Sequence, residues 1–300
     1  MSLLNHFVVK TLPFIPKAIV GQVSKRYIAG VTIGEAVGTV RNLNSKGFLA
    51  TIDLLGEDVH EENETLETQS NLRTILQTIS REGLDSNLSL KPTQLGLRIN
   101  PDLCYRNIKS IVDEAKRLGS FVRIDMEDST TTDATLNIYR KLRSEGFDNV
   151  GVVIQAYLRR SEKDVRSLLK EKANIRLCKG IYVESHEIAY EDREEIRRNF
   201  VLLLRIIIEN GLYVGIATHD DYLTEKAGEL IQKNRLRSDQ YEFQMLLGVR
   251  EQLRDGILRQ GHRLRVYVPY GEKWYAYSTR RLKENPQIAG YVFKSMFSLD

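Results

Sequence analysis

The sequence is poor in the residues that mark secreted, metal-binding or disordered chains. It has two cysteines, Cys104 and Cys178, whose spacing matches neither a metal site nor a disulfide framework. Its six prolines and its lack of a low-complexity tract argue against long flexible linkers. These absences favour a folded protein of a reducing compartment, so we expect a cytoplasmic location.

Long apolar runs and a charge of one sign are also missing. Near the N-terminus, residues 12–20 are apolar but are interrupted by Pro13, Pro16 and Lys17, and a bilayer span needs roughly 20 apolar residues. We expect a short amphipathic helix there, either packed on the rest of the chain or peripheral at the inner face of the membrane. The 44 basic and 40 acidic residues are mixed along the chain and leave a net charge of +4. This balance argues against nucleic-acid binding and slightly favours anionic ligands.

What the sequence does contain is a repeated pattern of short β-branched runs, each followed by a helical stretch. The predicted strands are residues 50–57, 88–95, 120–128, 150–157, 175–182, 212–219, 241–248 and 263–270. The predicted helices are residues 61–81, 102–118, 132–145, 162–172, 187–210, 220–234, 250–260 and 274–284. Strands that alternate with helices in this way are typical of parallel sheets.

Eight such units in 300 residues predict an α/β fold, a closed (β/α)8 TIM barrel over residues 49–300. Residues 1–48 are expected to form an N-terminal helical extension. An open, doubly wound sheet is the alternative, but no Gly-x-Gly-x-x-Gly motif opens a βα turn in this chain.

Polar residues gather where the predicted strands end. In a barrel these ends converge on one face, where catalytic groups lie. Because an unpaired buried charge costs several kcal/mol, Lys91, Asp125, Arg176 and Lys179 predict a paired ionic network around an anionic ligand.

The last predicted helix carries an unusual pair, Arg280 and Arg281, with Glu284 one turn after Arg280. Guanidinium groups bind carboxylates through two parallel hydrogen bonds, so this pair suits one small organic acid. Tyr267, Tyr275 and Tyr277 are candidates for flat walls against a ring. A solvated surface pair is the alternative reading of the two arginines.

The chain lacks the motifs of several self-sufficient chemistries. No two histidines have metal-ligand spacing, so no metal is expected, and no Gly-x-Ser-x-Gly elbow is present. A bound organic cofactor is therefore the expected source of reactivity. The alternatives are a lyase or aldolase that uses Lys91 or Lys179 as a Schiff base on a small oxo-acid, and a barrel that only binds a ligand or partner.

Several segments in order resemble the proline dehydrogenases, specifically the short monofunctional bacterial kind, over nearly the whole chain. They include Arg123-Ile-Asp-Met-Glu127, Arg176-Leu-Cys-Lys-Gly-Ile-Tyr182, Tyr241-Glu-Phe-Gln244 and Tyr277-Ser-Thr-Arg-Arg281, with further matches at 47–57, 88–96, 153–160, 217–219 and 265–269. The resemblance implies a distorted barrel capped by its final helix, with non-covalent FAD over the strand ends. It also implies oxidation of L-proline to Δ1-pyrroline-5-carboxylate, the first step of proline catabolism to glutamate.

The resemblance further implies hydride transfer from proline C5 to flavin N5 and electron transfer to a membrane quinone. A pyrroline-5-carboxylate dehydrogenase is the implied recipient of the product. Lys91, Arg280 and Arg281 would hold the substrate carboxylate, and Asp125 would pair with these cations. Tyr267, Tyr277 and Leu246 would pack on the proline ring.

The resemblance places Arg176 near flavin N5. The implied flavin contacts are Met126, Gln155, Arg176, Lys179, Gly180, Ile181, Thr218, His219 and Glu284. Three residues depart from the family pattern: Ile181 and Val183, where an alanine and a tryptophan are expected, and Pro92, which stiffens the chain after Lys91. The first two put the details of flavin stacking in question.

Overall fold

The computed structural model describes residues 20–21, 24–56 and 58–284, and it describes the backbone alone for residues 280–284. Within these residues eight parallel strands close into a barrel in the order β1 to β8. The strands are β1 (Leu49–Leu54), β2 (Ser86–Leu90), β3 (Val122–Ile124), β4 (Val150–Gln155), β5 (Ile175–Cys178), β6 (Val214–Ala217), β7 (Tyr241–Leu246) and β8 (Leu264–Tyr270). β8 pairs with β1, so the predicted closed barrel is confirmed and the open sheet is excluded.

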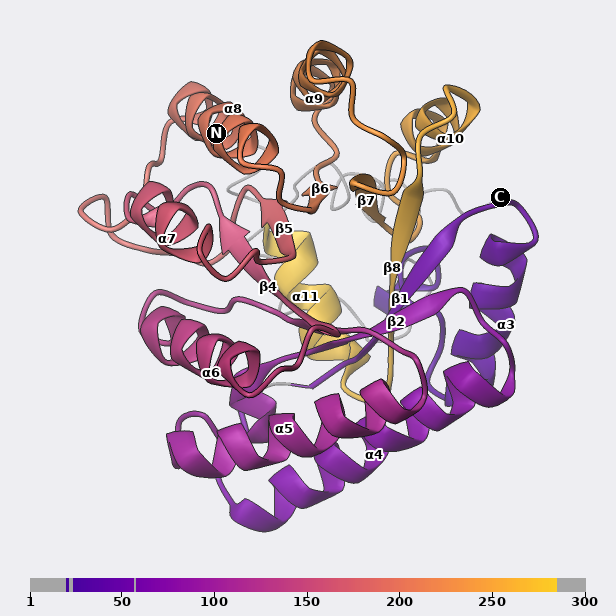
Figure 1. Cartoon of the computed structure of the whole chain (residues 1–300). Coiled ribbons are helices and arrows are strands. Elements are labelled where there is room, and N and C mark those ends of the chain that lie inside the picture. Colours follow the sequence, from indigo (N-terminus) through magenta and orange to yellow (C-terminus); the bar gives the residue numbers. More distant parts are fainter. Residues whose placement is uncertain (1–19, 22–23, 57, 285–300) are drawn as a thin grey trace.

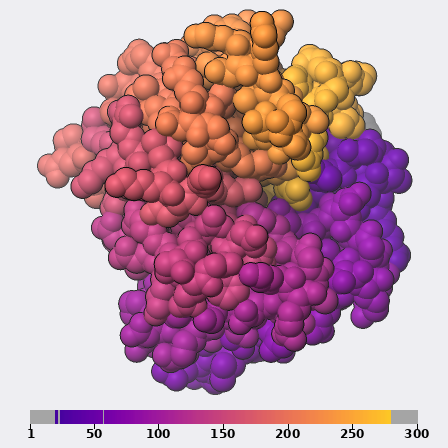
Figure 2. Space-filling model, in the orientation of Figure 1, coloured from indigo at the N-terminus to yellow at the C-terminus, as the bar shows by residue number. Residues whose placement is uncertain are grey.

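Helices follow the strands and surround them (Figure 1). They are α3 (Ile33–Asn44) before the barrel, and then α4 (Glu62–Arg81), α5 (Pro101–Arg117), α6 (Thr132–Ser144), α7 (Ser161–Leu168), α8 (Arg193–Glu209), α9 (Asp221–Lys233), α10 (Glu251–Arg259) and α11 (Trp274–Glu284). Figure 2 shows the early segments, indigo to magenta, forming one half of the molecule and the later segments the other half. This is the arrangement expected of consecutive βα units laid side by side.

Several predicted boundaries differ from the structure, and two of them have clear local reasons. The second strand was expected to reach Leu95, but β2 ends at Leu90 and residues 92–95 form a 3₁₀ turn. Pro92 lacks the N–H that a strand ladder needs and instead occupies the first position of that turn. The helix expected from residue 187 begins at Arg193, because the side chain of Asp192 accepts the backbone N–H groups of Glu194 and Glu195.

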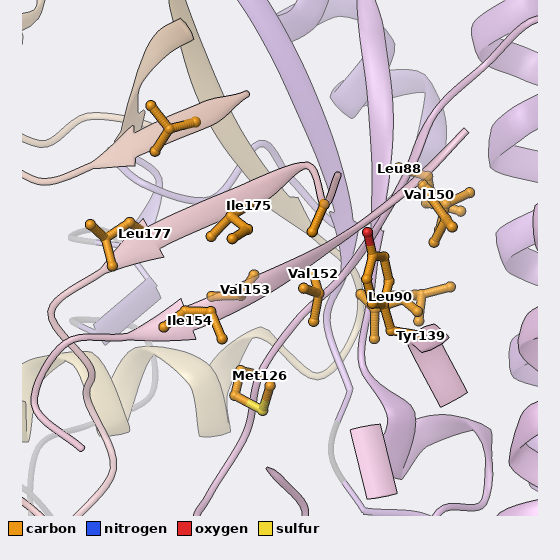
Figure 3. Packing of buried hydrophobic residues seen from close by; sticks show 14 of the residues in the cluster. Leu88, Leu90, Met126, Tyr139, Val150, Val152, Val153, Ile154, Ile175 and Leu177 are labelled. Carbon is orange, nitrogen blue, oxygen red and sulfur yellow. The ribbon is translucent and has the colours of Figure 1, made fainter. Parts of the chain in front are cut away.

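Successive side chains along each strand point alternately outward, into an apolar layer under the helices, and inward, into a more polar barrel interior. Figure 3 shows Val152 and Ile154 on one side of β4 and Val153 on the other. Val152 and Ile154 are buried in the cluster that also contains the inner faces of the helices, whereas Val153 also lines a cavity. The strands do not bury apolar residues on both faces throughout, because many inward positions carry hydrogen-bonding groups such as Arg176 and Gln244.

The helix before the barrel belongs to the same packing layer. Thr32 caps α3 by accepting the N–H of Glu35, whose carboxylate accepts the N–H of Thr32. Ala36 and Val40 of α3 lie in the hydrophobic cluster of the barrel strands. The boundary at residue 48 stays a prediction.

The final helix lies at one end of the barrel. In Figure 1 α11 lies inside the ring of helices, and Tyr277 of α11 lines the cavity together with strand residues. No helix in the described ranges combines the length and apolarity needed to cross a bilayer.

Candidate active site

A cavity of about 490 Å³ opens at the carboxyl ends of the strands. It is lined by every site residue that the resemblance implies and whose side chain is described, whereas Tyr275, the third candidate for a ring wall, is not among the lining residues. The implied residues that line it are Lys91, Asp125, Met126, Gln155, Arg176, Lys179, Gly180, Ile181, Thr218, His219, Leu246, Tyr267 and Tyr277. The expectation that the strand ends converge on one face is met because all eight strands are parallel.

Three predicted site residues fall outside this description. The backbone of α11 includes Arg280, Arg281 and Glu284, but their side chains lie outside the described part of the structure. The position of their shared helix beside the cavity follows from Tyr277 alone.

A lysine and an aspartate form a buried ion pair at one side of the cavity. Lys91 Nζ donates to Asp53 Oδ1 at 2.5 Å, and the two side chains are 12% and 1% exposed. Burial disfavours the ammonium charge, but the carboxylates of Asp53 and Asp125 outweigh burial and raise the pKa of Lys91 above its ordinary value. Lys91 is therefore a fixed positive charge in the cavity wall.

Asp125 collects three hydrogen bonds at the end of β3. Its Oδ1 accepts from Arg176 Nη1 at 2.8 Å and from Ser89 Oγ at 2.9 Å, and its Oδ2 accepts from the hydroxyl of Tyr267 at 2.8 Å. Burial raises the pKa of Tyr267 well above its ordinary value, and Asp125 adds to this shift. The phenol therefore keeps its proton and stays a donor to the carboxylate.

The pairing differs in one respect from the expectation. Asp125 was expected to pair with Lys91, Arg280 and Arg281. Among the described side chains its cationic partner is instead Arg176. Lys91 forms its ion pair with Asp53. The two pairs still lie close together, since Asp53 of β1 stands in register with Ser89 of β2, which donates to Asp125.

A second group of charges lines the same cavity. We call Lys179, Arg193, Arg197 and Arg250 the cationic rim, and all four line the cavity. Asp220 pairs with Lys179 and accepts from Arg197 Nε at 3.0 Å and Nη2 at 2.7 Å. Burial opposes the charge of this carboxylate, but Arg197 and Lys179 prevail and hold the pKa of Asp220 well below its ordinary value.

Two further side chains that the resemblance assigns to the cofactor are held by hydrogen bonds to the backbone. Gln155 Nε2 donates to the carbonyl of Glu127 at 2.8 Å, and His219 Nε2 accepts the backbone N–H of Leu246 at 2.9 Å. Gly180 has φ +106°, and a β-carbon there would lie 1.9 Å from the ring of Tyr157. Only glycine fits at this position, because the backbone packs directly against that ring.

Sequence reasoning missed several residues that line or support the cavity. Arg193 and Arg197 belong to the first two turns of α8, and the sequence pattern assigned them to a helix without a role in the site. Their spacing of four residues places both on one face of the helix that follows β5 and Lys179, and this is a signal that could have found them. Ser89 and the pair Glu242 and Arg265 carried no usable signal, because their partners are distant in sequence.

Fold and cavity together define a (β/α)8-barrel enzyme whose site holds fixed charges of both signs. The family model described as proline dehydrogenase matches residues 36–293. The chain is 39% identical over 273 residues to proline dehydrogenase 1 of Bacillus subtilis subsp. natto, covering 91% of this chain and 90% of that protein. It is 34% identical over 277 residues to the proline dehydrogenase of Deinococcus radiodurans, covering 91% and 89%.

The chain therefore belongs to the proline dehydrogenase family, the flavin-dependent oxidoreductases of proline catabolism. A solved structure with the same fold is proline utilization A from Bdellovibrio bacteriovorus, inactivated by N-propargylglycine. It aligns with a TM-score of 0.85 and 23% identity over 98% of this chain and 38% of that chain.

Proposed function

We propose that this protein oxidises L-proline to Δ1-pyrroline-5-carboxylate with non-covalently bound FAD and passes the electrons to a membrane quinone. The observation that carries the proposal is the pair of buried ionic contacts, Lys91 with Asp53 and Arg176 with Asp125, on the wall of one cavity. Cytoplasmic location and delivery of the product to a pyrroline-5-carboxylate dehydrogenase form part of the same proposal.

The residues of the cavity fit a flavin dinucleotide. Its volume of about 490 Å³ exceeds the needs of one small amino acid and is typical of sites for larger organic ligands. Arg176 Nη2 is buried and has no hydrogen-bond partner among the described residues, so this donor is available to a bound ligand. The cationic rim matches the chemistry of a pyrophosphate.

FAD supplies the hydride acceptor when it is bound, at its N5 atom. The protein's part is to bind, orient and exclude water. Lys91, Arg280 and Arg281 are assigned to the substrate carboxylate, because a fixed ammonium and two guanidinium groups bind it strongly. Tyr267, Tyr277 and Leu246 are assigned to the faces of the substrate ring.

Asp125 and Arg176 are assigned to the reacting region. Asp125 holds both Arg176 and the Tyr267 hydroxyl, which fixes a cation and a ring wall relative to each other. The positive charge of Arg176 favours the negative charge that the cofactor gains on reduction. Met126, Gln155, Lys179, Gly180, Ile181, Thr218, His219 and Glu284 are assigned to cofactor contacts.

The Schiff-base alternative fits the two lysines poorly. A lysine nucleophile must be a neutral amine, whereas Lys91 is ion-paired with Asp53 and has a raised pKa, and Lys179 is ion-paired with Asp220. A non-catalytic barrel is disfavoured by the membership of the chain in an enzyme family.

The test is an absorbance spectrum of the purified protein after incubation with FAD and removal of free cofactor. We expect a flavin spectrum that bleaches when L-proline is added without oxygen, and no bleaching with D-proline. A protein that takes up no FAD, or that keeps its oxidised spectrum with L-proline, contradicts the proposal.

A further inference from the structure

A line of four bonded side chains leads from Arg265 to Arg176 in the wall of the cavity. Arg265 donates to both oxygens of Glu242, from Nε to Oε1 at 2.6 Å and from Nη2 to Oε2 at 3.1 Å. Gln244 Nε2 donates to Glu242 Oε1 at 2.6 Å, and Arg176 Nε donates to Gln244 Oε1 at 2.5 Å. The line therefore joins β8, β7 and β5 across the barrel interior.

The direction of the Gln244 amide decides whether this line can hold Arg176. An amide has one accepting and one donating end, and the two ends differ little in shape. Arg176 can only donate and the carboxylate of Glu242 can only accept, so a single orientation satisfies both neighbours. Without the carboxylate, the amide can turn its donating end toward Arg176, where it repels the guanidinium.

The strand between them has room for this amide because it carries glycine. Gly215 of β6 stands in register with Arg176 on one side and with Glu242 on the other. A β-carbon at Gly215 would lie 2.4 Å from Gln244 Nε2. The amide therefore fills the place that a side chain of β6 would otherwise occupy.

Glu242 is held in its charged form. Burial disfavours the carboxylate, but Arg265 outweighs burial and, together with the hydrogen bond from Gln244, keeps the pKa of Glu242 below its ordinary value. Arg265 is itself fixed, since its Nη1 donates to the carbonyl of Ala50 at 2.6 Å. Gln244 lines the cavity and Glu242 is not among the described lining residues, so Glu242 reaches the site only through its neighbour.

We propose that Glu242 is a positioning residue that fixes the guanidinium of Arg176 through the amide of Gln244. This inference rests on the proposed function, because it gives Arg176 its place beside the flavin. Asp125 and Gln244 hold Nη1 and Nε of Arg176, and Nη2 is left without a partner among the described residues. The two anchors together set the direction in which Nη2 can donate.

The experiment measures the midpoint potential of the bound flavin, together with kcat and KM for L-proline. Arg176→Met removes the charge and is expected to make the potential more negative. Glu242→Gln is expected to move the potential in the same direction and to lower kcat about 10- to 100-fold, as a misplaced group does, with KM changed little. Gln244→Met should give a similar shift without removing any charge.

The double variant of Glu242→Gln and Gln244→Met distinguishes an effect of Glu242 that is transmitted through Gln244 from two independent effects on the flavin potential. If Glu242 acts through Gln244, the double variant shows no more shift than Gln244→Met alone. Glu114→Gln is the matched control. Glu114 is a buried carboxylate of α5 that pairs with Arg73 and Arg117, so this change should lower stability and leave the potential alone.

The outcomes separate this inference from the proposed function. If Arg176→Met shifts the potential and Glu242→Gln does not, or if the shifts of the two single variants add, the positioning role is wrong and the proposed function stands. Should Glu242→Gln not fold, an unshifted potential in Gln244→Met overturns the inference by itself. If the wild-type protein binds no FAD, the proposed function fails instead.

Discussion

Replacing Asp53 with asparagine tests whether the charge of Lys91 depends on a buried partner. The two side chains are 1% and 12% exposed, so little solvent is available to replace the lost carboxylate. Removing one partner of such a pair typically destabilises a protein by about 3–5 kcal/mol, because an uncompensated charge remains buried. For a chain of 300 residues a loss of about 3 kcal/mol lowers Tm by about 5 °C.

The same change is expected to weaken substrate binding. Without Asp53, burial pulls the pKa of Lys91 down and a smaller fraction of the ammonium is available to hold a carboxylate. The assay is thermal unfolding of the FAD-free protein, which avoids stabilisation by bound cofactor, followed by KM for L-proline on the FAD-loaded protein. Asp53→Asn should lower Tm and raise KM.

The double variant of Asp53→Asn and Lys91→Met provides the decisive control. Methionine leaves no charge to bury, so most of the lost stability should return, while KM should stay high because the carboxylate-binding cation is absent. A double variant as unstable as Asp53→Asn would refute the reasoning that an unpaired charge causes the loss. A KM that returns to the wild-type value would refute the role given to Lys91.

Three further predictions concern other parts of the site. Arg281→Met should raise KM for L-proline about 10- to 100-fold while FAD stays bound, and release of FAD with an unchanged KM would contradict the carboxylate role. Gly180→Ala should reduce FAD affinity and stability more than Gly211→Ala, because both glycines have a positive φ but only a β-carbon at residue 180 would clash with the ring of Tyr157. Equal losses of stability in the two variants would exclude the clash. Asp220→Asn should lower Tm at pH 7, and the difference in Tm from wild type should shrink below about pH 4, because a carboxylate whose pKa is lowered in the folded state loses its stabilising effect as it is protonated. A difference in Tm that persists unchanged at low pH would contradict the ion-pair explanation.

The strand order was predictable because local sequence dictates it. Runs such as Val150–Gln155 are β-branched and short, and each is followed by a stretch with helical periodicity. The ends were less predictable where one residue decides, as Pro92 does for β2 and the capping residue Asp192 does for α8. Pro92 was a local signal for the end of β2, because proline cannot donate to a strand ladder.

The cavity residues were largely predictable and their pairing was not. Parallel strands bring their carboxyl ends to one face, so the gathering of Asp125 and Lys179 follows from the fold alone. Which cation meets which carboxylate depends on the closed geometry of the barrel: Arg176 reaches Asp125 across 51 positions of sequence. Spacing along the chain carries no information about such contacts, and this is why the sequence placed Asp125 and Arg176 in one ionic network without identifying them as a pair.

The division between an apolar outer layer and a polar interior explains how this barrel can hold many charges at its centre. Strand residues such as Ile52 and Val266 are fully buried in the hydrophobic cluster shared with the helices, which supplies stability without any help from the interior. The interior positions are then free to carry Asp53, Arg176 and Glu242, whose burial is tolerated because each has a partner of opposite charge. Such pairs add little net stability, but they fix charges at defined places in a region of low dielectric, where a charge acts strongly on a bound ligand. A barrel filled with aliphatic side chains would gain stability and would lose the means of orienting Arg176 at the bottom of its own active site.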